Sequence, residues 1–306
     1  MVMVADGSAG ARRAAALLTI AACAEGTQAT LSEDAAKVDM KFSFRHAHEP
    51  GRLITVHAQV KSGKSYRAAT LDARTIGLKI DRETLHALSG TSTPGIVVWV
   101  PPSSLDRIYW YGRDPRRPLR TPIRISRLQY VRPSIRYDLS RLATYAGYTT
   151  ASARQTVREV DSFAAMIRAK EAYKALKKIT WIHPLVGPLR VTRLAWRHIT
   201  KRSRTTKRRI LRLQIAPYLK AFLTRAPDRY VCDLSSVRLI GRRTVEIRYL
   251  LCWYRSALEI KGVTYTLLTR IREQISYPTK WQHLPLSERD ISQNATLESW
   301  WCKEEK

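Results

Sequence analysis

The fold of the first half of the chain is decided by residues 53–61, which read Leu53-Ile54-Thr55-Val56-His57-Ala58-Gln59-Val60-Lys61. Apolar residues occupy every second position from Ile54 to Val60, and polar residues fill the positions between them. Because successive side chains of a strand point to opposite faces, this alternation predicts a half-buried strand. Gln59 and Lys61 then lie two residues apart on its polar face.

The residues before this strand predict a second strand of the same kind. From Val38 to Phe44 the apolar residues again alternate, and Asp39, Lys41 and Ser43 fall on the opposite face. A turn at residues 49–51, Glu-Pro-Gly, separates the two strands. We therefore expect their polar faces to meet in one cleft.

The surrounding sequence predicts an α/β domain over residues 1–138. An Ala- and Leu-rich stretch indicates a helix over residues 9–24, and residues 112–138, rich in Arg and Pro, are expected to form a loop-dominated exit from the domain. Between them we expect a short helix at 81–89, a buried strand at 96–100 and another strand at 108–111. The predicted architecture is a mixed sheet flanked by helices.

Residues 139–306 are expected to form a second domain, of basic α+β type. Residues 152–179 are predicted to be helical, and the Pro-containing segment 181–188 interrupts that pattern. Strand-like stretches follow at 229–239, 244–254 and 264–275, and their short connections predict an antiparallel meander packed against helices. Near the end, Trp300 and Trp301 are expected to dock on this domain, and stacking on bases is the alternative.

The charge of the chain points to a polyanionic partner. Lys and Arg total 54 against 25 Asp and Glu, a formal net charge of +29. A nucleic acid is the expected partner, DNA before RNA, and an anionic membrane surface or a general enrichment in Arg are the alternatives. The densest basic run, residues 190–212, contains no acid, which favours phosphate contact over a solvated helix. Its ten cations are Arg190, Arg193, Arg197, Lys201, Arg202, Arg204, Lys207, Arg208, Arg209 and Arg212.

The residue types on the polar faces of the first two strands suit metal-assisted hydrolysis. A carboxylate such as Asp39 is a preferred ligand of Mg²⁺, which needs only one or two protein carboxylates because waters and substrate phosphate complete its shell. A lysine held on a strand beside the metal can orient or deprotonate the attacking water and stabilise charge developing on phosphorus. Lys61 is the candidate for that lysine.

Asp39, followed by Gln59-Val60-Lys61-Ser62-Gly63 and Tyr66, resembles the PD-(D/E)xK restriction-endonuclease-like superfamily, in the Gln-x-Lys form of Mrr-like restriction enzymes. Residues 94–100, Pro-Gly-Ile-Val-Val-Trp-Val, and 108–110, Ile-Tyr-Trp, extend the resemblance to an uncharacterised bacterial branch, over roughly residues 9–135. The resemblance implies a Mg²⁺- or Mn²⁺-dependent endonuclease of restriction or phage-defence type. It assigns Asp39 and Gln59 as metal ligands and Lys61 as the catalytic lysine.

The chain departs from the pattern of that superfamily at two places. Its members often carry a Glu ligand in the first helix, yet residues 9–24 contain no acid, and Ala36-Lys37-Val38 stands where a glycine usually precedes the metal-binding Asp. A decayed nuclease fold kept for nucleic-acid binding or regulation is therefore the alternative function. Glu259-Ile260-Lys261 also spells Glu-x-Lys, with Asp233 upstream, but we expect Lys261 to be solvated at a hairpin turn. His46 and His48 are expected to be exposed loop residues.

The remaining features bear on location and assembly. The four cysteines show no metal or disulfide spacing and are expected to be reduced. No stretch reaches the roughly 18 apolar residues that span a bilayer. Arg12-Arg13, the apolar residues 14–22 and Cys23 imitate a lipoprotein signal, but we expect a retained helix and a cytoplasmic protein. A homodimer is compatible with this interpretation.

Overall fold

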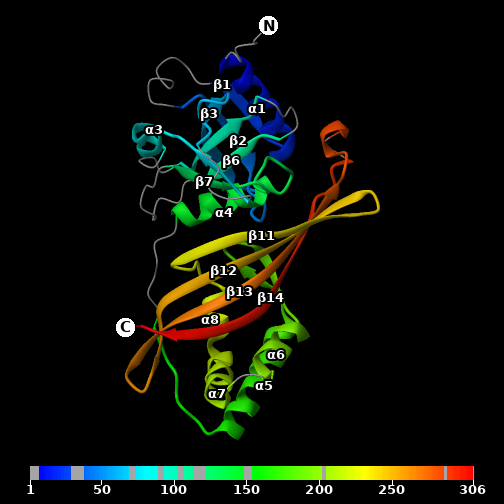
Figure 1. The fold of residues 1–306 in the computed structure, drawn as a ribbon. Helices are drawn as coiled ribbons and strands as arrows, with labels where there is room; N and C mark the ends of the chain where they lie inside the picture. The colour runs from blue at the N-terminus through cyan, green and yellow to red at the C-terminus, as the bar shows by residue number, and fades with distance from the viewer. Residues whose placement is uncertain are drawn as a thin grey trace. The chain divides into compact units, whose positions relative to one another are not determined.

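A computed structural model describes residues 7–28, 38–68, 74–88, 93–102, 107–112, 122–147, 154–201, 205–285 and 288–305. The chain forms two compact units, of which the first comprises Met1–Gly147 with Lys280–Asp290 and the second Tyr148–Thr279 with Ile291–Lys306. Both units combine helices and strands, as expected (Figure 1). The boundary expected after residue 138 falls inside helix α4 (Ile135–Gly147), which is continuous and belongs wholly to the first unit.

The first unit contains a five-stranded mixed sheet in the order β1-β2-β3-β5-β6. Neighbouring strands are antiparallel except β3 and β5, which are parallel. The two strands predicted from alternation are present as β2 and β3, and the predicted later strands as β5 and β6. The bounds are β1 Glu25–Gln28, β2 Met40–Arg45, β3 Leu53–Ser62, β5 Gly95–Val100 and β6 Tyr109–Gly112.

Helix α1 (Gly7–Ala22) packs on the apolar face of the central strand β3. Leu18 of the helix and Val56 of the strand are both fully buried. A Cβ atom on Gly10 would lie 2.8 Å from the Cβ of Ser62, so only glycine lets the helix approach β3 this closely. Ser62 lies on the same side of β3 as Val56, and Gln59 and Lys61 therefore lie on the side opposite α1.

A smaller hydrophobic cluster forms around a two-stranded antiparallel sheet of β4 (Thr75–Leu78) and β7 (Ile123–Ser126). Ile125 of β7 is fully buried in it, together with Val97 and Trp99 of β5 and Leu88 after helix α3 (Arg82–Ala87). The expectation of a loop-dominated segment at 112–138 was wrong for β7 and for the start of α4. The alternation of β7 covers only four residues, too few to stand out among the surrounding Arg and Pro.

The short segment Lys280–Asp290 completes the first unit. It begins with the 3-10 helix η2 (Trp281–His283), whose Trp281 is buried. Arg289 donates a hydrogen bond of 2.9 Å to the carbonyl oxygen of Ile20 in α1. The first unit thus depends on residues that follow it in the chain by more than 130 positions.

The second unit is built on a long, strongly twisted sheet whose strands run in the order β11-β12-β13-β14-β10-β9 (Figure 1). The predicted antiparallel meander is confirmed as β11, β12 and β13, whose turns contain Gly241 and Lys261-Gly262 with the positive φ angles that tight hairpins need. β10 is parallel to β14, and the short β8 (Gln155–Thr156) pairs in parallel with β12. The other bounds are β9 Trp181–His183, β10 Gly187–Val191, β11 Arg229–Ile240, β12 Arg243–Ile260, β13 Val263–Pro278 and β14 Ser292–Glu304.

Helices cover one face of this sheet (Figure 1). The helix expected at 152–179 begins only at Ser162, because the side chain of Asp161 caps it by accepting hydrogen bonds of 2.9 Å from two backbone N–H groups. The residues before it include β8, with 151–153 outside the described residues. The helices of this unit are α5 Ser162–Lys178, α6 Arg193–Thr200, α7 Thr206–Ile215 and α8 Leu219–Leu223, with the 3-10 helix η1 Ala216–Tyr218 between the last two.

The tail of the chain forms the central strand β14, which was not predicted as a strand. Trp300 is fully buried, and its Nε1 donates a hydrogen bond of 3.0 Å to the carbonyl oxygen of Arg212 in α7. Docking of this tryptophan on the second unit is confirmed. Across the described part of the chain, every helix is too short or too polar to cross a bilayer.

Candidate active site

Two of the residues predicted to act together, Asp39 and Gln59, are brought together by the pairing of β2 with β3. Asp39 comes directly before β2, and its backbone N–H donates to the carbonyl oxygen of Ala58 at 3.1 Å. This register puts Asp39 opposite Gln59. Gln59 Nε2 and the backbone N–H of Val60 each donate a hydrogen bond of 2.5 Å to Asp39 Oδ2. The carboxylate is thus held in one orientation by two short hydrogen bonds.

The amide group of Gln59 is buried and only partly satisfied. The residue is 5% exposed, and its Oε1 accepts no hydrogen bond from any described residue. A buried acceptor without a partner costs about 1–3 kcal/mol of folding free energy. An oxygen atom of this kind beside a carboxylate is suited to meet a cation or an ordered water.

Lys61 lies on the same face of β3 as Gln59, two residues farther along the strand. Its Nζ lies 5.4 Å from the centroid of the Tyr66 ring, a cation–π contact. Within the described residues it forms no ion pair with an acid. The ammonium group therefore remains available beside the Asp39–Gln59 pair.

Asp81 is a second carboxylate near this site, and the charge of Lys61 affects the pKa of Asp81. The sequence did not indicate that Asp81 lies here. Asp81 caps α3 by accepting hydrogen bonds from the backbone N–H of Thr84 at 2.6 Å and from its hydroxyl at 2.8 Å. Burial raises its pKa, but these hydrogen bonds and the charge of Lys61 together bring the pKa below the ordinary value. The sequence around residue 81 predicts the start of a helix. It contains no pattern that would place this end of the helix near β3.

His57 lies on the same face of β3, opposite Lys41 of β2. Burial and the neighbouring charge of Lys41 lower the pKa of His57, so its imidazole is neutral at pH 7. Its Nδ1 is buried and has no hydrogen-bond partner among the described residues. The polar face of β3 thus offers two buried atoms, His57 Nδ1 and Gln59 Oε1, that lack partners in the described part of the chain.

The ligand set suits a Mg²⁺ ion that is held by few protein atoms. Asp39 and Gln59 offer oxygen donors, and Mg²⁺ keeps several waters and is commonly bound by one or two carboxylates together with substrate phosphate. In the described residues no three His, Cys, Asp or Glu side chains gather closely enough to form a metal cage. The residues present therefore fit a substrate-assisted metal site, and they do not build a complete one by themselves.

His46 and His48 do not form an exposed loop, contrary to expectation. His46 is 1% exposed, and its Nδ1 accepts hydrogen bonds from the backbone N–H groups of His48 and Glu49. Its Nε2 must then carry the proton and donate to the hydroxyl of Thr144 in α4, at 2.9 Å. The turn after β2 is fastened to α4 in this way, and these histidines are structural.

The second Glu-x-Lys sequence does not form a comparable site. Glu259 forms an ion pair with Arg154 at 3.3 Å, and Lys261, in the hairpin turn, forms one with Glu159 at 2.6 Å. Asp233 pairs with Tyr249, ten residues before Glu259 on β12, which corresponds to about 30 Å along a strand. These groups are therefore not brought together.

The predicted basic run is divided among three elements. Six of its cations are exposed, Arg209 is partly buried, and none of these seven forms an ion pair within the described residues. Arg212 was wrongly assigned to phosphate contact, because it is 8% exposed and its guanidinium lies 5.9 Å from the ring of Trp301. Arg202 and Arg204 lie outside the described residues. The exposed members are Arg190 in β10, Arg193 and Arg197 in α6, Lys201 after it, and Lys207 and Arg208 in α7.

No protein-family model, curated protein or solved structure matches this chain. Its function is therefore inferred from its residues and their geometry.

Proposed function

We propose that this protein is a metal-dependent endonuclease that hydrolyses phosphodiester bonds of DNA, in restriction or phage defence, and that its first unit is a PD-(D/E)xK-like domain. The observation that carries the proposal is the placement of Asp39, Gln59 and Lys61 on one face of the β2–β3 pair. Asp39 and Gln59 are in direct contact, and the buried Oε1 of Gln59 lacks a partner among the described residues.

Each residue has a distinct role in this proposal. Asp39 and Gln59 would hold Mg²⁺ or Mn²⁺, which supplies Lewis-acid polarisation of the phosphate and an activated water when bound. The two hydrogen bonds on Asp39 Oδ2 keep its carboxylate oriented before substrate arrives. Lys61 would orient that water and stabilise negative charge that develops on the phosphate oxygens.

The order of elements after Lys61 agrees with the segment on which the resemblance rests. After β3 come the short strand β4, the helix α3, the buried β5 with Trp99 and then β6 with Trp110. Trp99 Nε1 donates a hydrogen bond of 3.0 Å to the carbonyl oxygen of Gly63, whose φ of 98° makes the turn directly after β3. This contact fixes the end of the strand that carries Lys61.

A non-catalytic nucleic-acid-binding or regulatory protein on a decayed nuclease fold is the second candidate. It is favoured by the small ligand set and by the first helix, which contributes no acid and packs on the face of β3 opposite Gln59. Such a protein would keep the net charge of +29 and bind nucleic acid without cutting it.

Incubation of the purified full-length protein with supercoiled plasmid in Mg²⁺, Mn²⁺ or EDTA separates the two candidates. The nuclease predicts nicked or linear plasmid that appears only with the divalent ion. A parallel incubation with RNA of similar length tests the preference for DNA. Plasmid that is bound but stays supercoiled under all three conditions would support the second candidate.

A further inference from the structure

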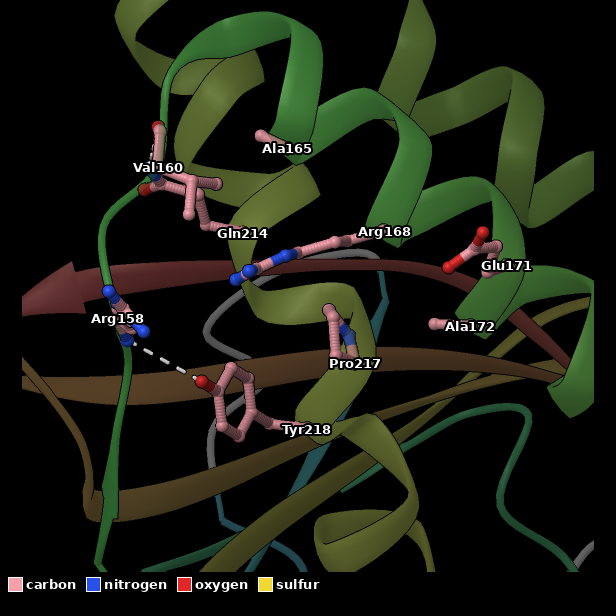
Figure 2. Close-up of a pocket in the computed structure, with 9 residues that line it drawn as sticks. All are labelled: Arg158, Val160, Ala165, Arg168, Glu171, Ala172, Gln214, Pro217 and Tyr218. Atoms are coloured by element: carbon pink, nitrogen blue, oxygen red, sulfur yellow. Dashed lines mark hydrogen bonds between the residues drawn. The ribbon is translucent and has the colours of Figure 1, made fainter.

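A pocket of about 300 Å³ in the second unit lies apart from the residues assigned above. It is lined by α5, by the end of α7 with η1, and by the segment that precedes α5 (Figure 2). The buried Gln214 of α7 donates a hydrogen bond of 3.0 Å to the carbonyl oxygen of Val160 and so joins two of its walls. The pocket therefore has walls that are tied to one another.

Two arginines give this pocket its charge. Arg158 and Arg168 both line it, and Figure 2 shows the guanidinium of Arg168 reaching across toward Gln214. Neither arginine forms an ion pair with an acid in the described part of the chain. The backbone N–H of Arg158 donates a weak hydrogen bond of 3.4 Å to the Tyr218 hydroxyl, which places that hydroxyl at the same wall. Each guanidinium offers five donors in a fork that matches phosphate oxygens.

The acid in the lining, Glu171, limits which anion fits. Glu171 lies on α5 three residues after Arg168, so the two are neighbours on the helix surface, yet they form no ion pair with each other. With two arginines and one glutamate among its described residues, the pocket keeps a net positive charge of one. A ligand that carries a phosphate next to hydroxyl or amino groups would satisfy both signs, because the carboxylate can accept hydrogen bonds from those groups.

We propose that this pocket binds the terminal phosphate and adjoining nucleoside at the end of a nucleic-acid strand. Its volume is at the lower limit of small-ligand pockets, which suits one nucleotide and excludes a duplex. A terminal phosphate monoester carries about −1.5 to −2 charges at pH 7, against one for each backbone diester, so two arginines favour the end over the interior of the strand. The proposal rests on the proposed function, since phosphodiester hydrolysis leaves a phosphate monoester on one of the two new ends.

The test measures binding of the full-length protein, in EDTA, to fluorescent single-stranded oligonucleotides of one sequence that carry a 5′-phosphate, a 3′-phosphate or no terminal phosphate. We expect one phosphorylated end to bind about tenfold more tightly than the hydroxyl end, as one charge-assisted contact allows. The variant Arg158→Gln/Arg168→Gln should lose this preference. The control Arg193→Gln/Arg197→Gln removes the same charge from α6. It should weaken the binding of all three oligonucleotides equally and keep the preference for the phosphorylated end.

Equal affinity of the wild-type protein for all three ends would overturn the proposal, as would a preference that survives in Arg158→Gln/Arg168→Gln. A wild-type protein that binds no oligonucleotide would overturn it as well. Absence of metal-dependent plasmid cleavage would remove the nuclease function alone, because the end preference is measured without a divalent ion. The two failures are thus distinguishable.

Discussion

Gln59 donates its side-chain hydrogen bond to the same oxygen atom of Asp39 that accepts the backbone N–H of Val60. One carboxylate oxygen therefore accepts a hydrogen bond from the backbone of β3 and another from a side chain of the candidate site. Changes at Asp39 will affect folding and chemistry together, whereas changes at Lys61, which makes no hydrogen bond to a described residue, should affect chemistry alone.

Lys61→Ala should lower the rate of plasmid cleavage about 10²- to 10³-fold, because it removes a positioned charge that stabilises the transition state. Asp39→Asn should abolish cleavage and also lower the melting temperature. The matched controls are Lys64→Ala and Asp233→Asn, both at exposed residues. Cleavage rates come from single-turnover gels, and folding is followed by circular dichroism. Wild-type rates in both Lys61→Ala and Asp39→Asn would rule out this site.

Gln59→Glu should make the stability of the protein depend on Mg²⁺. Without metal, a second carboxylate against Asp39 raises the pKa of one of the pair and lowers the melting temperature. With Mg²⁺ the same carboxylate becomes a ligand, and binding to the folded state restores stability. Thermal melts in EDTA and in Mg²⁺ measure this, with Gln274→Glu on the exposed surface of β13 as control. An equal response of the two variants to Mg²⁺ would contradict a metal site at Gln59.

Lys207→Gln/Arg208→Gln/Arg209→Gln in α7 should weaken binding to duplex DNA of every sequence. Removing the cation that neutralises one phosphate lowers the slope of log affinity against log salt by about 0.9, so the slope should fall by up to about 2.7. Fluorescence anisotropy at several salt concentrations measures it. The control Arg238→Gln/Arg242→Gln/Lys303→Gln removes equal charge from exposed positions outside the run. A slope that is unchanged in the α7 variant would mean that this part of the run is only a solvated surface.

The stability of the first unit should fall as the pH drops below about 6.5. Burial, with the neighbouring charge of Arg141, lowers the pKa of His48 to about 3, so the folded protein keeps it neutral while the unfolded chain binds a proton near pH 6.5. The unfolded state is therefore favoured progressively between pH 6.5 and 3. Between pH 7 and pH 5 the free energy of unfolding should fall by about 1 kcal/mol, because His48 is only partly buried. Urea unfolding should show a smaller loss in His48→Gln, and an equal loss would contradict the assignment.

Much of the sheet of the first unit and the proximity of Asp39 to Gln59 could be predicted because β2 and β3 each carry apolar side chains on one face and polar side chains on the other. Their apolar residues alternate strictly, and the alternation fixes which side chains share a face. The hairpins of the second unit were predictable for a related reason, since Gly241 and Gly262 mark their turns.

The strand β14 could not be predicted, because its burial does not alternate. Residues 297–300 are all buried, and the register with β13 shifts between Arg270 and Ile271. The burial of other residues also depends on contacts with segments that are distant in the sequence. The sequence around Arg212 and His46 does not indicate that either residue is buried. Arg212 is covered by β14, and His46 is covered by α4. Asp81 was missed for the same reason.

The segment Lys280–Asp290 gives the first unit a discontinuous sequence, with the strands β11 to β13 of the second unit encoded between its two parts. During synthesis the ribosome must make residues 148–279 of the second unit before Arg289 can reach the carbonyl oxygen of Ile20. In tandem domains the amino-terminal domain usually folds first. Here the first unit cannot complete its folding before the intervening part of the second unit has been made. The chain passes between the two units three times, after residues 147, 279 and 290, so recombination that exchanges one unit would need three simultaneous crossovers, and the pair should be inherited together.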